Sequence, residues 1–382
     1  MSTASSSSTA TPTEGSVQGQ RGTGFAGPLM APPHGGETRR GAGGAFRSIA
    51  VVGVGAIGGL FAGWLGARLP AGQLQLSAVA RGETLRALRE RGLTWVDDQG
   101  AEHRVAVHAS DDPASLGVQD LVIVSVKGPA MPAVAPAVRA LMGPQTVVLV
   151  AMNGVPWWFF DGLPGEAAGL RLNAVDPGGV TAEAIPTSQV IGCVVHASAA
   201  APAPARIERI RNNQLIIGEP AGGVSPRVQA LSDLLGQAGF GVTVSERIQR
   251  DIWFKLWGNM TMNPVSAITG APCDRILDDA LVRGFCSAVM REAQAIGARI
   301  GIPIEQDPED RHAVTRKLGS FKTSMLQDVE AGRPIELDAL VGAVREIGQH
   351  LGEATPSMDA LMGLTRLMGH MRGLYPELTK TP

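Results

Sequence analysis

The sequence lacks the residue patterns that mark disulfide-rich, zinc-binding or nucleic-acid-binding proteins. Its three cysteines, Cys193, Cys273 and Cys286, are scattered without a CxxC pair or a histidine-rich cluster, so we expect no metal site and a reducing, cytoplasmic environment. Lysine and arginine (33) almost balance aspartate and glutamate (35), for a net charge of −2. That balance leaves no basic surface for nucleic acid or an anionic membrane, and it favours a small-molecule ligand.

Aromatic residues are also scarce, at 4% of the chain, whereas glycine is abundant, with 49 residues. This composition favours tight turns and close backbone approach over an aromatic-rich binding surface, and it points to an α/β protein. The 382 residues, of which 44% are hydrophobic, suffice for two domains that each bury a core. We therefore expect a globular protein with more than one domain.

The N-terminal region is poor in large apolar side chains. Residues 1–45 are mostly Ser, Thr, Gly, Pro and Ala, which cannot bury enough surface to offset the entropy of ordering, so we predict a disordered tail. Residues 49–67 then carry no charge, and Arg39, Arg40 and Arg47 precede them. A signal peptide or membrane anchor has the same appearance. Several glycines within the run, and the alternating segments after it, favour a folded domain.

Beyond this point, segments with the character of buried strands alternate with helical or loop segments. Strand-like runs cover residues 74–80, 121–126 and 146–151, and a helix-like run covers 84–91. This alternation is typical of a Rossmann-type, doubly wound parallel sheet. A short apolar strand at residues 242–244 should complete the sheet.

The second half of the chain changes to long amphipathic helices. We expect helices over residues 226–238, 247–262, 274–300, 310–330 and 337–351. The domain boundary is placed between residues 245 and 246, at the end of the last strand. This division gives an α/β domain over residues 46–245 and an all-α substrate and catalytic domain over residues 246–382.

A GxGxxG motif, formed by Gly53, Gly55 and Gly58, directly follows a buried strand and opens a helix. The first glycine permits a tight turn, the second lets the backbone approach a pyrophosphate, and the third lets helix and strand pack closely. Unpaired N–H groups at the start of the helix, where Ala56 and Ile57 lie, attract phosphates. The sequence thus predicts a dinucleotide cofactor held by these five residues.

The second strand ends at Arg81, where an NAD-specific site would place an acid on the adenosine ribose. A carboxylate would repel a 2′-phosphate, whereas a guanidinium pairs with one in a forked geometry, so the sequence favours NADP. The alternatives are that Arg81 is a solvated surface residue beside Arg86 and Arg89, or that Glu83 reaches a ribose hydroxyl instead.

Two later strands end in polar residues at the carboxyl edge of the sheet, where open α/β folds hold ligands. Lys127 follows one strand, and Asn153 follows the next. Both are expected to face the crevice. Alternatively, Lys127 caps the sheet edge, and Asn153 supplies the turn before Gly154.

Lys255, Asn259 and Asn263 are spaced four residues apart, which places them on one face of a helix. Most of their neighbours are apolar, and in such surroundings a lysine can shift its pKa and donate a proton. The alternative is an exposed Lys255 paired with Asp251, with Asn263 ending the helix before Pro264. Two asparagines inside an apolar helix are costly unless they are bonded, which favours a functional role.

The motif Lys255-x-x-x-Asn259-x-x-x-Asn263-Pro264, with the glycine motif and the Asn153-Gly154 turn, resembles the ketopantoate reductase family. The similarity spans about residues 49–372. Residues 324–329 are similar to the family's substrate-binding serine segment, and residues 334–338 to its glutamate segment. All of these pieces occur in the family's order.

The resemblance implies NADPH-dependent reduction of 2-dehydropantoate (ketopantoate) to pantoate, for pantothenate and coenzyme A synthesis. It implies that Lys255 is the proton donor to the carbonyl oxygen and that Asn259 and Asn263 bind the substrate. Ser324 would hold the substrate carboxylate, and Glu336 would close on the active site as the second catalytic group. From the residues alone, Ser324 could be a helix-surface hydroxyl, and Glu336 a first-turn acid favoured by the helix dipole.

The same resemblance assigns cofactor contacts to residues outside the glycine motif. Asn153 would lie beside the nicotinamide and the substrate, and Lys127 nearer the adenine side of the crevice. Arg81 would contact the 2′-phosphate. Glu336 would lie close enough to contact the cofactor as well. Hinge closure between the two domains would then gate turnover.

The chain departs from the family pattern near the catalytic edge. The aromatic run Trp157-Trp158-Phe159-Phe160 and residues 161–186 are longer than the family core requires. The aromatics could line the substrate pocket or form a subunit contact in a homodimer. His196 is expected to be structural. The departure leaves open a reductase of another branched or aromatic 2-keto acid, and a nucleotide sensor without turnover is a third interpretation.

Overall fold

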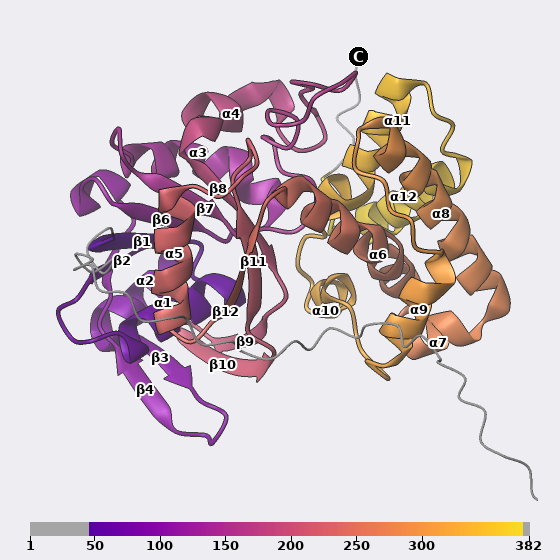
Figure 1. Cartoon of the computed structure of the whole chain (residues 1–382). Helices are drawn as coiled ribbons and strands as arrows, with labels where there is room; N and C mark the ends of the chain where they lie inside the picture. The colour runs from indigo at the N-terminus through magenta and orange to yellow at the C-terminus, as the bar shows by residue number, and fades with distance from the viewer. Residues whose placement is uncertain (1–45, 377–382) are drawn as a thin grey trace, which may run out of the picture. The chain divides into compact units, whose positions relative to one another are not determined.

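The computed structural model describes residues 46–376, which belong to one compact unit, Gly41–Pro382. The disordered tail that we predict for residues 1–45 lies outside the described residues. Within them, an α/β region precedes a helical region along the chain (Figure 1).

The main sheet has eight strands in the order β12-β11-β8-β7-β6-β1-β2-β5 (Figure 1). Its strands are β1 (Ser48–Val52), β2 (Gln75–Val79), β5 (His108–Ser110), β6 (Leu121–Val124), β7 (Val147–Val150), β8 (Val190–Val195), β11 (Gln214–Gly218) and β12 (Gly241–Ser245). All neighbours pair in parallel except β8 and β11, which are antiparallel. The expected parallel sheet is therefore confirmed as mostly parallel, and the strand expected at residues 242–244 forms its edge.

Helices cover both faces of this sheet because its central strands are apolar on both sides. Along β6, Val122 and Val124 pack in one core with α3 (Met131–Ala140). Leu121 and Ile123 pack in a second core on the opposite face. That second face is covered by α1 (Ala56–Arg68), α2 (Gly82–Arg91) and α5 (Pro226–Gln237). The sheet is thus doubly wound.

The uncharged run at residues 49–67 divides into the buried strand β1 and the 13-residue helix α1. Across residues 46–376, no helix is both long enough and apolar enough to cross a membrane. The interpretation of this run as part of a folded domain is confirmed by its strand and helix. The run is apolar because β1 and most of α1 are buried inside the α/β region.

A second sheet of four strands, which the sequence did not predict, packs against α1. Its strands are β3 (Leu93–Val96), β4 (Glu102–Val105), β9 (Ser198–Ala203) and β10 (Arg206–Arg211). The contact is close at Gly59, where an added Cβ would collide with Ile207. Hairpin β9–β10 lies between β8 and β11 along the chain, and β8 and β11 run in opposite directions.

Short helical turns complete the α/β region. They are η2 (Pro113–Leu116), η3 (Gly128–Ala130), η4 (Pro177–Gly179), α4 (Val180–Ala184) and η5 (Thr187–Gln189). Two of them, η4 and α4, lie in the segment that is longer than the family core requires, and α4 packs on α3. The added segment is therefore folded onto the sheet's helical layer.

The region after β12 is helical, as expected. Its helices are α6 (Ile248–Thr269), α7 (Cys273–Asp278), α8 (Ala280–Arg299), α9 (Pro308–Arg316), α10 (Ser324–Glu330), the π-helical turn η6 (Asp338–Gly342), α11 (Ala343–Leu351) and α12 (Pro356–Met371). Helix α12 was not predicted. Helix α6 contacts α7, α8, α10 and α12, so it lies at the centre of this region.

Three of the predicted helix boundaries are wrong. The helix predicted over residues 274–300 is divided at Asp279, whose carboxylate caps α8 by accepting hydrogen bonds from Leu281 and Val282 N–H. The helix predicted over residues 310–330 is likewise divided, and Thr323 caps α10. The third, α6, does not end near Asn263 but continues through Pro264 to Thr269, because its packing outweighs the local effect of proline.

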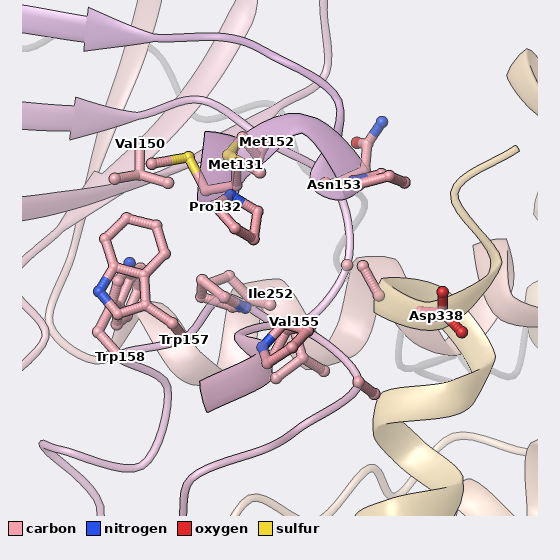
Figure 2. Close-up of a pocket in the computed structure, with 18 of the residues that line it drawn as sticks. Met131, Pro132, Val150, Met152, Asn153, Val155, Trp157, Trp158, Ile252 and Asp338 are labelled. Atoms are coloured by element: carbon pink, nitrogen blue, oxygen red, sulfur yellow. The ribbon is translucent and has the colours of Figure 1, made fainter. Parts of the chain in front are cut away.

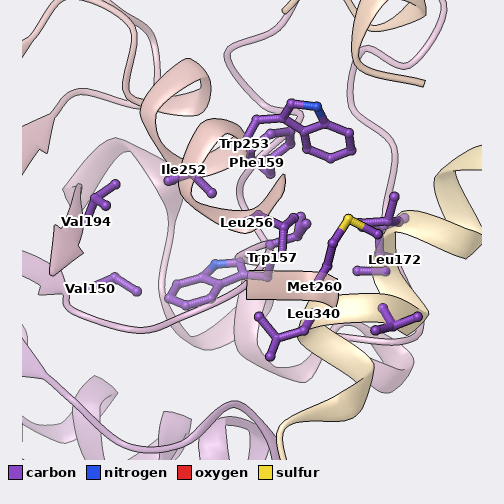
Figure 3. Packing of buried hydrophobic residues seen from close by; sticks show 14 of the residues in the cluster. Val150, Trp157, Phe159, Leu172, Val194, Ile252, Trp253, Leu256, Met260 and Leu340 are labelled. Atoms are coloured by element: carbon purple, nitrogen blue, oxygen red, sulfur yellow. The ribbon is translucent and has the colours of Figure 1, made fainter. Parts of the chain in front are cut away.

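One hydrophobic core joins the sheet to the helices (Figure 3). Val150 and Val194 of the sheet belong to the same buried cluster as Leu256 of α6. The inserted aromatics are part of it: Trp157 is 5% exposed, and Trp158, Phe159 and Phe160 are at most 1% exposed. All four side chains are buried in this core and do not reach the surface of the chain. The alternative that they form a subunit contact is therefore wrong.

Candidate active site

The glycine motif forms a tight turn between β1 and α1. Gly53 has a φ of +93°, which favours glycine, and its carbonyl accepts a hydrogen bond of 2.9 Å from Ser125 Oγ. An added Cβ at Gly58 would collide with that carbonyl and with Ser125 Oγ. A Cβ added at Gly55 would have no neighbouring atom within 4 Å. Gly53 and Gly58 are thus required by the turn itself, whereas Gly55 leaves open space above it.

This open space is suited to a phosphate group. Gly55 is the N-terminal cap of α1 and provides no side-chain hydrogen bond to the first-turn N–H groups, next to Ala56 and Ile57. Backbone N–H groups at a helix N-terminus bind anions, and the helix dipole adds to the attraction. The residues present therefore fit a dinucleotide, on the evidence of the turn's own geometry.

Arg81 follows β2 and caps the N-terminus of α2. Because β1 and β2 are parallel, with Val52 opposite Val79, Arg81 lies at the same sheet edge as the glycine turn. Its side chain is exposed. Nearby, Glu83 forms an ion pair of 3.6 Å with Arg86.

Lys255 joins α6 to the carboxyl edge of the sheet. Its Nζ donates hydrogen bonds of 2.8 Å to Asn153 Oδ1, just after β7, and of 2.6 Å to the carbonyl of Val195, at the end of β8. Asp251 instead accepts a hydrogen bond of 2.5 Å from Ser245 Oγ. The alternative of an exposed Lys255–Asp251 pair is therefore wrong.

The surroundings of Lys255 change its acidity. Burial lowers the pKa of Lys255 to about 8, and the negative charge of Glu336 offsets part of that shift. Asn153, Lys255 and Asn259 line one small hollow with Met152 and apolar side chains. The structure thus brings Asn153, at the sheet edge, together with Lys255 and Asn259 of α6.

Glu336 reaches the sheet edge from the helical region. Its Oε1 accepts a hydrogen bond of 3.0 Å from Gly128 N–H, just beyond β6. Burial raises the pKa of Glu336, while this hydrogen bond and the charges of Lys127 and Lys255 oppose the shift. Lys127 itself forms an ion pair of 2.5 Å with Asp328 of α10. Both side chains therefore bridge the α/β and helical regions.

Lys255, Asn259 and Asn263 form a polar stripe along one face of α6, and Ser324 of α10 lies beside Asn263. Asn263 is 6% exposed, and its Nδ2 lies 3.4 Å from Oγ of Ser324, a long hydrogen bond. Ser324 is exposed at the first turn of α10. The structure thus brings the predicted substrate residues together in two linked groups, one at Lys255 and one at Asn263. Arg81 is at a different place, near the glycine turn.

A cavity of about 210 Å³ lies beside Asn153 (Figure 2). It is lined by Met131 and Pro132 of α3, Val150, Met152 and Gly154 at the end of β7, Trp157, Trp158, Val175, Cys193, Ile252 of α6, and Asp338 and Ala339 of η6, among others. The wall is mostly apolar. Trp157 and Trp158 therefore line a cavity, while their contact with a substrate stays a prediction.

The sequence assigned no function to His196 or to Arg311, which lie in the neighbourhood of the candidate site. His196 follows Val195, and desolvation, with the charges of Lys255 and Arg311, lowers its pKa to about 4. Its imidazole is therefore neutral at neutral pH. Arg311 of α9 places its guanidinium 5.1 Å from the centre of the Phe254 ring. No local signal distinguishes Arg311 from any other helix-surface arginine, because its neighbours come from a distant helix.

A glycine turn that opens a helix at the carboxyl edge of a doubly wound sheet is typical of dinucleotide-dependent oxidoreductases. Comparison with known proteins agrees with this class. Residues 49–156 match the family model "Ketopantoate reductase PanE/ApbA", and residues 247–369 match the model of its C-terminal part. The chain belongs to the ketopantoate reductase family and is an oxidoreductase.

Individual relatives cover nearly the whole described chain. A 2-dehydropantoate 2-reductase from Mesorhizobium japonicum is 40% identical over 328 residues, which are 86% of this chain and 99% of the relative. A crystal structure from Ralstonia solanacearum MolK2, provisionally named a ketopantoate reductase, is 57% identical, with a TM-score of 0.81, and covers 87% of this chain and 100% of its own. A 2-dehydropantoate 2-reductase from Methylococcus capsulatus is 26% identical, with a TM-score of 0.72 and coverage of 85% and 97%.

Proposed function

We propose that this protein reduces 2-dehydropantoate to pantoate with NADPH, in pantothenate and coenzyme A synthesis, and that Lys255 is the general acid. The observation that carries the proposal is the hydrogen bond from Lys255 Nζ to Asn153 Oδ1. It brings a buried amine of the helical region to the sheet edge that also carries the glycine turn. The 40% identity to a 2-dehydropantoate 2-reductase supports the choice of substrate.

The chemistry asks little of the protein beyond positioning and proton transfer. When bound, NADPH supplies the hydride to the keto carbon. Lys255 holds a proton at Nζ and transfers it to the substrate oxygen as negative charge develops there. A pKa of about 8 keeps the ammonium form dominant at neutral pH and makes it a stronger acid than an exposed lysine. Asn153 and the Val195 carbonyl fix the direction of the amine.

The other polar residues of the stripe are assigned to the substrate. Asn259 lines the hollow with Lys255, and Asn263 and Ser324 form the second polar group one turn further on. We assign hydrogen bonding of the substrate to the two asparagines and carboxylate binding to Ser324. Glu336 helps to keep Lys255 protonated through its charge and contacts the cofactor.

For the cofactor, we assign the phosphates to Gly53, Gly55, Ala56, Ile57 and Gly58. Arg81 contacts the 2′-phosphate, since it is exposed at the end of the strand next to the glycine turn.

Asn153 also lies beside the nicotinamide, and Lys127 faces the crevice on the adenine side, where its ion pair with Asp328 connects it to α10. A division into an NADP-binding domain (46–245) and a catalytic domain (246–382) follows from these assignments.

The test is steady-state oxidation of NADPH in the presence of purified protein and 2-dehydropantoate, with pantoate identified by mass spectrometry. We expect stoichiometric pantoate formation and a clear preference for NADPH over NADH. Absence of pantoate at millimolar substrate would contradict the proposal. Reaction mixtures without 2-dehydropantoate measure the background oxidation of NADPH.

A second substrate class is favoured by the cavity beside Asn153. Its apolar wall, which includes Trp157 and Trp158, could accept a branched or aromatic side chain larger than that of 2-dehydropantoate. A panel that includes 2-dehydropantoate, 2-ketoisovalerate and phenylpyruvate ranks the candidates by kcat/KM. A higher kcat/KM for phenylpyruvate would assign the protein to aryl substrates. NADPH binding without turnover of any of them would favour a sensor instead.

We also propose that the protein is a cytoplasmic homodimer. Leu364, Leu367 and Met371 of α12 are 58%, 59% and 79% exposed, and their spacing places them on one helix face. An apolar face of this kind can bury itself against the same face of a second copy. Light scattering should give twice the chain mass for the wild type and the chain mass for a Leu364→Asp, Leu367→Asp variant.

A further inference from the structure

Arg311 is a cation beside the reactive helix that has no anionic partner among residues 46–376. Its Nε is buried and makes no hydrogen bond within that part of the chain. Burial lowers the pKa of Arg311, and no acid offsets the shift. By contrast, Arg227, which is also half-buried, is paired with Glu219 at 2.5 Å. A guanidinium removed from water without a counter-charge is costly, so its retention calls for a functional reason.

The guanidinium packs against the face of α6 that carries Phe254 and Gly258, which adjoins the face of Lys255 and Asn259. It is 5.1 Å from the centre of the Phe254 ring, and an added Cβ at Gly258 would be 2.9 Å from its Nε. Phe254 directly precedes Lys255, and Gly258 directly precedes Asn259. The charge of Arg311 also acts on His196, next to the carbonyl that Lys255 contacts. Arg311 is therefore a close neighbour of the candidate site.

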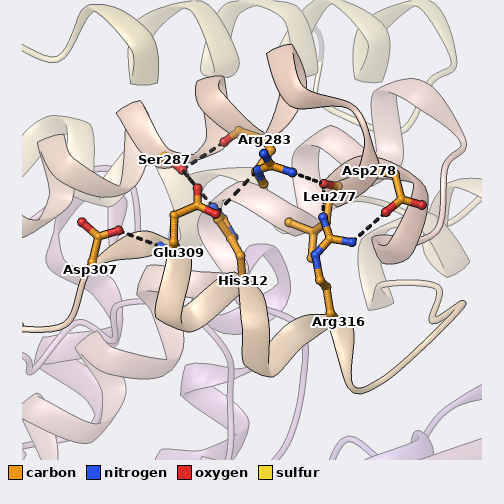
Figure 4. Close-up of polar contacts among 8 residues, drawn as sticks. All are labelled: Leu277, Asp278, Arg283, Ser287, Asp307, Glu309, His312 and Arg316. Atoms are coloured by element: carbon orange, nitrogen blue, oxygen red, sulfur yellow. Dashed lines mark hydrogen bonds and ion pairs between the residues drawn. The ribbon is translucent and has the colours of Figure 1, made fainter. Parts of the chain in front are cut away.

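A polar network between α8 and α9 holds in place the helix that carries Arg311; Figure 4 shows the network itself. His312 is 2% exposed, and its Nε2 lies 3.0 Å from Ser287 Oγ of α8. Ser287 also donates a hydrogen bond of 3.2 Å to Glu309. Serine, histidine and glutamate together can form a nucleophilic site, but Ser287 and His312 are buried, so this network ties α9 to α8.

The end of the same helix is tied down as well. Arg316 forms an ion pair of 2.7 Å with Asp278 and also donates a hydrogen bond to the Leu277 carbonyl (Figure 4). Because α9 is held at both places, Arg311 is presented to α6 in a defined position. Preorganised charge of this kind is what an anion-binding site requires.

We infer that Arg311, in addition to Ser324, binds the carboxylate of the 2-keto acid substrate, a contact that rests on the proposed function. The alternative source of an anion is the cofactor phosphate. Arg311 lies on the helical side, beside the stripe of Lys255 and Asn259, whereas the glycine turn and Arg81 lie at β1 and β2. The location therefore favours the substrate.

The first test compares Arg311→Met with the wild type at saturating NADPH. The KM for the 2-keto acid should rise roughly 10- to 100-fold, which is the range expected for a lost charge-assisted hydrogen bond, with a smaller change in kcat. Arg311→Lys should restore part of the loss. Arg291→Met, at an exposed position of α8, is the matched control and should keep the wild-type KM.

A neutral substrate separates charge recognition from a general disturbance. The methyl ester of the same 2-keto acid has no carboxylate, so its kcat/KM should change little in Arg311→Met. The preference of the wild type for the acid over the ester should therefore collapse in the variant. An equal loss for acid and ester would overturn the inference, because it would indicate a structural role.

The second test does not need turnover. Oxamate, an unreactive carboxylate analogue of a 2-keto acid, is titrated into wild type and Arg311→Met while tryptophan fluorescence is followed. Weaker oxamate binding in the variant, with unchanged NADPH affinity, supports the inference even if 2-dehydropantoate is not reduced. Equal oxamate affinities, or a loss confined to NADPH binding, would refute it. Failure of the wild type to make pantoate would refute only the proposed function.

Discussion

The glycine turn and the lysine cluster occupy one edge of the sheet, but they are built in different ways. The three glycines of the turn lie within one short segment, residues 53–58, which Ser125, 72 residues away, supports by a hydrogen bond to the Gly53 carbonyl. The lysine cluster joins Lys255 to Asn153 and Val195, which are 102 and 60 residues away along the chain. The comparison teaches that binding of the cofactor can be specified locally, whereas the proton donor depends on how two regions pack.

Among substitutions that distinguish the lysine cluster from the glycine turn, Lys255→Ala is expected to have the largest effect on activity. Removal of the general acid should lower kcat by roughly 1000-fold, within the range for acid–base catalysis, and leave NADPH affinity within about twofold. Stopped-flow turnover and fluorescence titration of NADPH measure the two quantities. Full activity of the variant would remove the chemical basis of the proposed function.

Its control is Lys317→Ala, at an exposed position at the end of α9. This variant loses the same side chain without touching the hollow that Lys255 lines. It should retain the wild-type kcat. A comparable loss in both variants would indicate that lysine substitution disturbs the helical region rather than proton transfer.

The next largest effect compares two glycines of the turn. Gly58→Ala would force a collision with the Gly53 carbonyl and should destabilise the fold by about 1–3 kcal/mol, as overpacking does. Gly55→Ala meets no atom within 4 Å, so it should fold normally. Its methyl group projects into the space assigned to the phosphates, and the Kd for NADPH should rise tenfold or more, by roughly 1.4 kcal/mol.

Thermal unfolding and NADPH titration of both variants provide the check. The expected pattern is a lower Tm for Gly58→Ala and a wild-type Tm with weak binding for Gly55→Ala. Wild-type NADPH affinity in Gly55→Ala would show that the phosphates lie elsewhere. These two glycine substitutions therefore test whether the glycine turn alone determines cofactor binding, without altering any charged group.

Local patterns predicted five of the eight strands of the main sheet, namely β1, β2, β6, β7 and β12. Buried apolar runs gave β1, β6 and β7, and the glycine motif gave the strand, turn and helix at residues 48–68. The stripe of Lys255, Asn259 and Asn263 followed from helical spacing alone, and it holds even though α6 is longer than predicted. Periodicity succeeds for these elements because each is defined by its own side chains.

The features that the sequence did not predict depend on contacts between distant segments. The pairing of β8 with β11, the small sheet on α1 and the position of Arg311 all require tertiary packing. The division at Asp279 is different, because aspartate is a preferred helix cap and the signal was present. The capping preference of aspartate by itself predicts a helix start at Asp279.

A smaller effect is expected at Arg81, which belongs to the local half of the comparison. Arg81→Ala should raise the KM for NADPH only roughly tenfold, because solvent screens an exposed ion pair. The KM for NADH should stay unchanged, because NADH has no 2′-phosphate. Arg86→Ala, which breaks only the exposed pair with Glu83, is the control. Equal losses for both cofactors would indicate that Arg81 does not contact the 2′-phosphate.

The smallest effect is expected in the pH dependence of the lysine cluster, which is built by contacts between distant segments. Reduction needs Lys255 with its proton, and its pKa is about 8, so kcat/KM should be flat below pH 8 and fall as the pH rises through that value. Between pH 7 and pH 9 the ammonium fraction drops about tenfold.

Because the charge of Glu336 favours the ammonium, Glu336→Gln should move the midpoint below that of the wild type. Rate measurements across pH 6–10, with stability confirmed at each pH, follow this midpoint. A midpoint that stays in place after the substitution would show that Glu336 does not act on Lys255 through its charge. Its bond to Gly128 would then be the reason for its position, and the assembly of the two regions would account for its role.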